Sequence, residues 1–243
     1  MQISRGTGEY RAEIRERPGW LVPVAILIVT TVLGAAFLLY YLGPNPGALI
    51  EQRASPTART EPVQLRIGGL SLTIPANYLP FASARSGGAR RSVALYAELP
   101  DFRGYSDARA QTFSRNNPAI VTMSIRQEEF DVPEAEKLRR IYLGDVTDAK
   151  GTSAPFGLIE YTFRDDSGYR GEDLLVGQVG GRAVVMRCVR ANAEPTEPAC
   201  MRDVWLARGV ALSYRFERSH LASWREIARG VDRLAASFAR RAG

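Results

Sequence analysis

The sequence predicts an α+β protein: an N-terminal transmembrane helix, then one exported domain whose mainly antiparallel sheet is covered by a long C-terminal helix. Three observations predict this architecture. A long uncharged apolar run lies near the N-terminus, several later segments alternate apolar and polar residues, and the C-terminal segment has apolar residues at helical spacing. Alternation of this kind is typical of strands with one wet face, which mostly pair antiparallel.

The apolar run covers residues 20–42 and contains no charged side chain. Its 23 residues would extend about 34 Å as a helix, enough to cross a hydrocarbon core of about 30 Å. Trp20 at one end and Tyr40 and Tyr41 at the other suit the membrane interfaces. A cleaved signal peptide and a buried soluble helix are the alternatives. The run is longer than a signal-peptide core, and no small-x-small cleavage pattern follows it, so we expect an uncleaved single-pass anchor.

The arginines predict the orientation of this segment. Four arginines precede it, whereas Arg53 and Arg59 are the only basic residues in the twenty positions after it. Lys and Arg are enriched on the cytoplasmic side of membrane spans. We therefore expect residues 1–19 to be a cytoplasmic tail and residues 43–243 to lie in the periplasm, with the span in a bacterial inner membrane. Four arginines precede the span: Arg5, Arg11, Arg15 and Arg17.

The exported part divides into a linker and a domain. Residues 43–62 contain four prolines and two glycines, a composition typical of a semi-extended tether. Residues 63–243 have the length of one ordinary domain. We therefore expect a single folded unit held away from the membrane.

Two pairs of glycines mark β-hairpins, because glycine tolerates the positive φ of tight hairpin turns. Gly68 and Gly69 separate two alternating segments, and Gly180 and Gly181 separate two more. The predicted strands are residues 63–67, 70–74, 93–99, 120–126, 157–163, 174–179, 182–189 and 210–216.

The clearest predicted helix is residues 219–241, with Ser219 as its N-cap. Its apolar stripe includes Trp224, which we expect to be buried against the sheet. A second helix is expected at residues 133–143 and a short third from Ser106. The stripe consists of Leu221, Trp224, Ile227, Ala228, Val231, Leu234, Ala235 and Phe238.

The chain has two cysteines, Cys188 and Cys200, and an exported location would expose them to an oxidising compartment. Eleven residues separate them, so they do not form a C-x-x-C redox pair. A zinc site would need more ligands, and the only histidine, His220, lies beside a predicted helix start. We expect a structural disulfide and no metal.

Motifs for nucleophilic or nucleotide chemistry do not occur: the chain has no G-x-S-x-G, no P-loop and no H-E-x-x-H. We expect no cofactor. The net charge of +6 comes mostly from arginines spread along the chain, and with an exported location it does not favour nucleic acid. Residues 164–173 are expected to form a solvated turn. An enzymatic alternative would use carboxylates there: Asp165, Asp166, Glu172 and Asp173.

Aromatic and basic residues in loops offer a candidate partner surface. Such aromatics either pack locally or recognise a partner, and several arginines in a glycine-rich loop can hold anionic groups. We expect an accessory or assembly factor that binds another envelope protein rather than an enzyme. A carboxylate-dependent periplasmic enzyme and a transmembrane signalling protein are the alternatives. The candidate residues are Tyr78, Phe81, Phe102, Tyr105, Arg85, Arg90 and Arg91.

Overall fold

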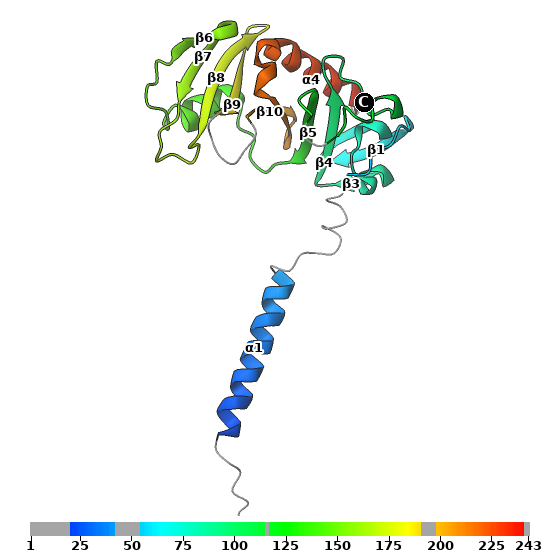
Figure 1. Cartoon of the computed structure of the whole chain (residues 1–243), viewed down its shortest axis with the longest axis vertical. Coiled ribbons are helices and arrows are strands. Elements are labelled where there is room, and N and C mark those ends of the chain that lie inside the picture. The colour runs from blue at the N-terminus through cyan, green and yellow to red at the C-terminus, as the bar shows by residue number, and fades with distance from the viewer. Residues whose placement is uncertain (1–19, 42–53, 115–116, 191–197, 241–243) are drawn as a thin grey trace, which may run out of the picture. The chain divides into compact units, whose positions relative to one another are not determined.

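The computed structural model describes residues 20–41, 54–114, 117–190 and 198–240. The chain divides into two units, Met1–Ile50 and Glu51–Gly243. The described part of the first unit is helix α1 (Leu21–Tyr41) with Trp20 before it (Figure 1).

Helix α1 coincides with the predicted transmembrane segment, residues 20–42. In the part of the chain that the structure describes, no helix meets the length and apolarity that a membrane crossing requires. The tail at residues 1–19 lies outside the described residues. The transmembrane anchor and the topology therefore stay predictions.

The second unit contains a large eight-stranded sheet in which every neighbouring pair is antiparallel, as predicted. The second predicted hairpin is present, with its turn at Gly180–Gly181. In spatial order the strands are β4 (Ser92–Glu98), β5 (Ile120–Gln127), β11 (Val210–Glu217), β10 (Ala199–Ala207), β9 (Arg182–Val189), β8 (Glu172–Val179), β7 (Leu158–Thr162) and β6 (Thr152–Ala154).

A smaller sheet is built on the predicted first hairpin, whose turn is Gly68–Gly69. Within the described residues, strands β1 (Pro62–Ile67) and β3 (Gly88–Arg90) are the one strand pair that runs parallel. Part of the predicted linker belongs to this unit, because the Ser55 backbone N donates to the Pro80 carbonyl oxygen at 2.8 Å. In order the strands are β12 (Ala239–Arg240), β2 (Leu70–Pro75), β1 (Pro62–Ile67) and β3 (Gly88–Arg90).

The helical segments are shorter than predicted. The C-terminal helix α4 is Trp224–Phe238, and a 3₁₀ segment, η6 (Arg218–Ser223), precedes it. Its N-cap position is therefore Ser223 and not Ser219. The second predicted helix is a single turn, α3 (Glu134–Lys137), followed by a π-helical turn, η4 (Leu138–Tyr142). The remaining 3₁₀ turns are η1 (Ala76–Tyr78), η2 (Ala82–Ser86), η3 (Asp107–Arg109) and η5 (Pro155–Gly157).

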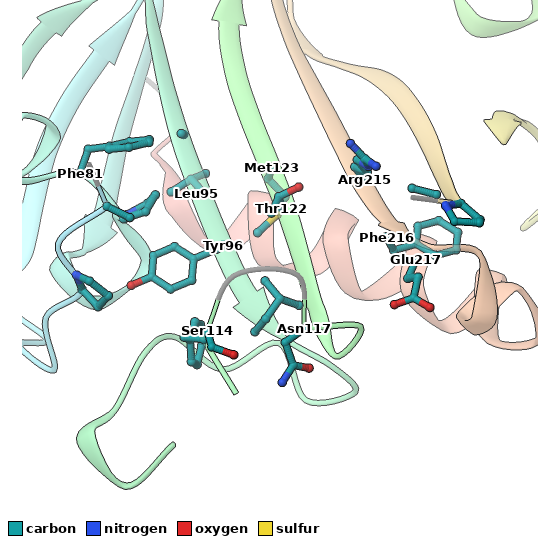
Figure 2. Close-up of a pocket in the computed structure, with 18 residues that line it drawn as sticks. Phe81, Leu95, Tyr96, Ser114, Asn117, Thr122, Met123, Arg215, Phe216 and Glu217 are labelled. Carbon is teal, nitrogen blue, oxygen red and sulfur yellow. The ribbon is translucent and has the colours of Figure 1, made fainter. Parts of the chain in front are cut away.

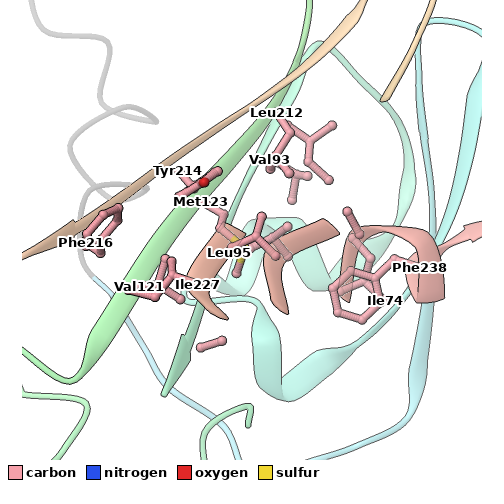
Figure 3. Close-up of a cluster of buried hydrophobic side chains, with 14 of the residues drawn as sticks. Ile74, Val93, Leu95, Val121, Met123, Leu212, Tyr214, Phe216, Ile227 and Phe238 are labelled. Atoms are coloured by element: carbon pink, nitrogen blue, oxygen red, sulfur yellow. The ribbon is translucent and has the colours of Figure 1, made fainter. Parts of the chain in front are cut away.

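Helix α4 lies along one face of the large sheet and closes the main core (Figure 1). Trp224 is 0% exposed, which confirms the prediction that its apolar stripe faces inward. Figure 3 shows Ile227 and Phe238 from α4 beside core side chains of β2, β4, β5 and β11. The labelled strand residues are Ile74, Val93, Leu95, Val121, Met123, Leu212, Tyr214 and Phe216.

The opposite face of the large sheet is covered only in part. A second apolar cluster packs the η4 turn onto β7, β8 and β9. At the other end of the sheet, the outer face of β4, β5 and β11 is left to loops. The second cluster consists of Tyr142, Val146, Tyr161, Phe163, Leu174 and Val185.

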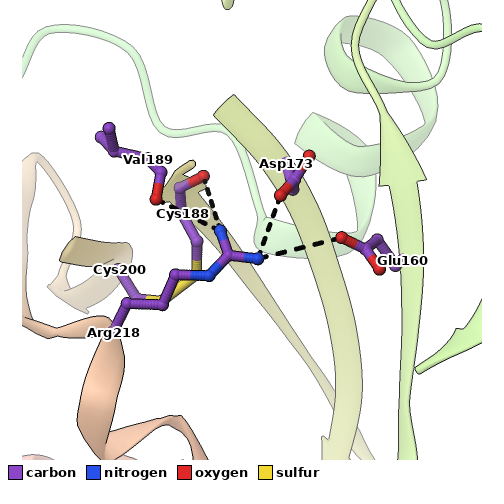
Figure 4. Close-up of a disulfide and its surroundings, with 6 residues drawn as sticks. All are labelled: Glu160, Asp173, Cys188, Val189, Cys200 and Arg218. Atoms are coloured by element: carbon purple, nitrogen blue, oxygen red, sulfur yellow. Dashed lines mark hydrogen bonds and ion pairs between the residues drawn. A yellow bond between two sulfur atoms is a disulfide. The ribbon is translucent and has the colours of Figure 1, made fainter. Parts of the chain in front are cut away.

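The predicted disulfide between Cys188 and Cys200 is present, with the two Cα atoms 4.0 Å apart. The cysteines face each other across β9 and β10. Arg218, at the start of η6, donates to the carbonyl oxygen of Val189 at 3.2 Å and to an Asp173 carboxylate oxygen at 3.0 Å (Figure 4). The start of the C-terminal segment is thereby tied to the β8–β9 hairpin.

Candidate partner-binding site

A pocket opens on the outer face of the large sheet, opposite α4. Strand register places Tyr96 of β4 opposite Thr122 of β5, and Thr122 opposite Arg215 of β11. Side chains of directly opposed residues lie on one face, so these three form a row that is the floor of the pocket. We call the site the aromatic pocket.

Loops supply its walls. Phe81 flanks Tyr96 on one side (Figure 2). Ser114 and Asn117 come from the loop after η3. Glu217 lies at the far end of the pocket. The volume is about 470 Å³, at the small end of the range usual for ligand sites. Other lining residues include Pro56, Pro80, Phe113, Ile120 and Pro198.

Tyr96 is the central residue of the pocket. Its position in the alternating strand β4 places it on the outer face, yet it is only 7% exposed. The cause is an aromatic cover: the Phe113 ring packs edge-on against Tyr96 with centroids 4.8 Å apart, and Tyr105 packs against Phe113 at 5.4 Å.

The hydroxyl of Tyr96 is buried and has no hydrogen-bond partner among the described residues. Burial raises the pKa of Tyr96 from 10.0 to about 12; the charge of Arg85 opposes this rise and Tyr105 adds to it. The phenol therefore stays protonated at neutral pH and is a hydrogen-bond donor without an acceptor. A buried polar group in this state is costly to leave unpaired, and it would gain an acceptor if a ligand oxygen displaced the side chains that cover it.

The predicted partner-surface residues are only partly brought together. Phe81 lines the aromatic pocket, and Arg85 and Tyr105 lie close enough to influence Tyr96. Arg85 is also held in place, since it donates to the Leu79 carbonyl oxygen at 2.9 Å.

The other predicted aromatics belong to the core side of the domain. The Tyr78 ring packs edge-on against Phe238 of α4 at 5.2 Å, and its hydroxyl donates to the Phe102 carbonyl oxygen at 3.1 Å. Phe102 lies against Gly230, where an added Cβ would come within 1.9 Å of the ring. Tyr78 and Phe102 therefore contribute to the packing of the core.

Arg90 and Arg91 stand apart from the aromatic pocket. The Arg90 guanidinium donates to the Ser86 hydroxyl and to the Ser83 carbonyl within the same loop. Arg91 is exposed, and its carbonyl oxygen accepts the Gln127 backbone N–H at 2.8 Å. Neither arginine lines the pocket.

The carboxylates of the enzymatic alternative do not gather in a pocket. Asp165 and Asp166 are exposed, Glu172 pairs with Arg187 at 3.0 Å, and Asp173 is buried. Its oxygens accept from Arg190 at 2.7 Å and Arg218 at 3.0 Å. Within the described residues, no group of three His, Cys, Asp or Glu side chains could hold a metal ion.

Comparisons with known proteins find a similar fold among solved structures. No protein-family model matches the sequence. No curated protein matches it either. The structure is similar to an immunity protein of the Stenotrophomonas maltophilia type IV secretion system, with a TM-score of 0.53 and 18% identity over 75% of this chain and 94% of that chain. The iron-regulated outer membrane lipoprotein FrpD of Neisseria meningitidis gives a TM-score of 0.45 and 12% identity over 77% and 97%. At such low identity, the likeness to the immunity protein shows the fold alone.

Replacing Tyr96 by Phe should stabilise the domain by about 1–2 kcal/mol at pH 8, because it removes a buried hydroxyl that lacks a partner. The gain should grow above pH 10. There the unfolded tyrosine ionises while the folded one, with its pKa near 12, stays neutral, so the wild type loses stability as the pH rises. Urea denaturation at pH 8 and pH 11 would measure both effects.

Tyr214→Phe is the matched control. Tyr214 also has a burial-raised pKa of about 12, but its hydroxyl lies 3.4 Å from Arg202 Nη1 and accepts from it. Its removal should therefore destabilise at pH 8. If both variants shift stability in the same direction at pH 8, the Tyr96 hydroxyl is not an unpaired donor.

Proposed function

We propose that this chain is a single-pass envelope protein whose exported domain binds another protein through the aromatic pocket, as an accessory or assembly factor. The observation that carries the proposal is the buried, unpaired donor of Tyr96 at the floor of an open pocket with aromatic and proline walls. Aromatic-lined pockets with a polar handle are typical anchor sites in protein interfaces. The partner would insert an apolar side chain beside an oxygen acceptor.

The fold supports an accessory role, since a similar structure is that of an immunity protein of a secretion system. The uncharged run at residues 20–42 supports anchoring in the inner membrane. The arginines before it support a cytoplasmic tail at residues 1–19. The Cys188–Cys200 disulfide is compatible with the oxidising periplasm.

The domain in this proposal is not an enzyme. Support comes from the predicted catalytic carboxylates: arginine partners neutralise Glu172 and Asp173, and Asp165 and Asp166 are exposed rather than gathered in a pocket. A signalling role would depend on residues 1–19, which lie outside the described residues.

Location is tested separately from binding. A reporter that fluoresces only in the cytoplasm, fused after Gly243, should be dark, and the protein should resist extraction from membranes with alkaline carbonate. A bright fusion would overturn the orientation. Release by carbonate would overturn the anchor.

Binding is tested by co-purification from solubilised membranes with two matched variants. Phe81→Asp places a charge in the wall of the aromatic pocket. Phe130→Asp places the same charge on a side chain that is 78% exposed and does not line the pocket. A partner that is lost with Phe81→Asp and retained with Phe130→Asp supports the proposal. Equal retention in both variants contradicts it.

A further inference from the structure

The large sheet opens between two of its central strands. Strand β9 pairs with β10 only at the disulfide end, through Cys188 with Cys200 and Arg187 with Met201. Beyond this point, β9 from Arg182 to Met186 and β10 from Arg202 to Ala207 have no strand partner on their facing edges among the described residues. Two strand edges thus face each other without forming a ladder.

Glu134 of α3 closes the inner end of this gap. Its Oε1 accepts from the Val185 backbone N at 2.5 Å and from Arg202 Nε at 2.9 Å, and its Oε2 accepts from Arg202 Nη2 at 2.9 Å. The Glu134 carboxylate therefore links β9 to β10 where the first missing backbone hydrogen bonds of the ladder would lie. On the side of Glu134 away from the disulfide, no other side chain of the described residues bridges β9 and β10 in this way.

The space beyond Glu134 is a cleft of about 940 Å³. Its floor is α4, through residues that include Asp232, Ala235 and Ala236, and mostly apolar residues of β9 and β10 line its sides. It shares no lining residue with the aromatic pocket. The strand residues are Val179, Arg182, Ala183, Val184, Arg202, Val204, Trp205, Leu206 and Ala207.

The backbone of β9 shows which groups face the cleft. The Val185 N–H points to Glu134 and hence away from β8. Successive N–H groups of a strand point to opposite edges, so the Ala183 N–H also points into the cleft. Exposed strand edges of this type are the template on which an extended peptide adds as a strand.

The charges of the lining cancel. Glu134 neutralises Arg202 within the cleft, and Arg182 and Asp232 carry opposite charges at exposed positions. The cleft therefore matches an uncharged segment. The alanines and valines leave room for small or β-branched apolar side chains, which are the side chains that strands favour.

We propose that the gap between β9 and β10 binds an extended, uncharged segment of a partner protein, rich in small or β-branched residues, which adds as a strand between them. Beyond the Glu134 contact, the open edge of β10 from Asp203 to Ala207 spans about 13 Å, the length of four to five extended residues. The inference goes beyond the aromatic pocket and does not depend on it.

A synthetic peptide tests the proposal directly. The probe is a fluorescein-labelled heptapeptide of alternating threonine and valine with blocked ends, titrated into the purified full-length protein and followed by fluorescence anisotropy. We expect saturable binding, together with slower hydrogen exchange of the Ala183 amide in the complex. N-methylation of the central valine keeps every side chain but removes a main-chain donor, and should weaken binding by about tenfold.

Two protein variants locate the site. Ala236 and Ser237 are neighbouring exposed residues of α4, and only Ala236 lines the cleft. Ala236→Phe should weaken peptide binding by about tenfold, whereas Ser237→Phe should leave it within about twofold. Phe81→Asp in the aromatic pocket should have no effect, which separates this test from that of the proposed function.

Three results would overturn the proposal. They are the absence of saturable binding, equal affinity for the N-methylated peptide, and equal weakening by Ala236→Phe and Ser237→Phe. In the second case the peptide would bind by its side chains alone, and in the third it would bind elsewhere.

Discussion

Trp224→Ala should destabilise the C-terminal domain by about 3–5 kcal/mol, the range for deleting a large buried aromatic side chain. The indole is completely buried, and its Nε1 donates to the Phe156 carbonyl oxygen at 3.2 Å. Strand β8 makes room for the ring with a glycine: a Cβ at Gly177 would come within 2.4 Å of Trp224 Cη2. The substitution would therefore leave a cavity between helix and sheet.

The fit between Trp224 and Gly177 allows a sharper test than a single variant. Gly177→Ala should destabilise the wild-type protein, because its methyl group collides with the indole, but should cost little in the Trp224→Ala background. Urea denaturation of the four proteins, followed by far-ultraviolet circular dichroism, gives the coupling energy. Additive effects would show that the two residues do not share this contact. An unchanged midpoint for Trp224→Ala would mean that the helix does not close the core.

Glu134→Ala should cost about 3–5 kcal/mol, the penalty for removing one partner of a buried ion pair. Arg202 is 7% exposed. Burial alone would lower the pKa of Arg202, but its hydrogen bonds and ion pair with Glu134 outweigh this and raise the pKa. Loss of Glu134 would leave a buried guanidinium without its carboxylate and the Val185 N–H without its acceptor.

Two companion variants separate these contributions and are measured by the same urea denaturation. Glu134→Gln keeps an acceptor for the Val185 N–H but loses the charge, so its cost should be smaller than that of Glu134→Ala. The double variant Glu134→Leu with Arg202→Met removes both charges and should recover most of the stability. If the double variant is as unstable as Glu134→Ala, the cost arises from packing or from the unpaired Val185 N–H and not from an unpaired charge.

The elements with regular patterns were predictable from the sequence. The glycine pairs marked both hairpins, and the apolar stripe of residues 221–238 marked the buried face of α4. The two cysteines could be paired because a chain with one histidine offers them no metal site, and because an exported location was expected. In each case a local rule of spacing or chemistry agrees with the final structure.

Strand β10 was not predicted, because Arg202 occupies an inward position where alternation requires an apolar residue. Only a partner 68 residues away in sequence, Glu134, makes that position tolerable. The aromatic pocket was missed for a related reason. Tyr96 occupies an outward position, and only the distant Phe113 shows that it is covered. Contacts that depend on the strand order leave no periodic trace in the sequence.

Helix α4 also has a consequence for the time at which the domain can fold. The first hairpin, β1–β2, contributes Leu72 and Ile74 to the same core as Trp224 and Phe238, and β12 directly after the helix pairs with β2. The first hairpin and the C-terminal helix therefore form the main core together. A ribosome delivers Phe238 more than 160 residues after Ile74, so the main core cannot close before helix α4 has been made. A domain assembled in this order stays open until its last helix has been made, and an open polypeptide is the form that can be threaded through a narrow translocation channel.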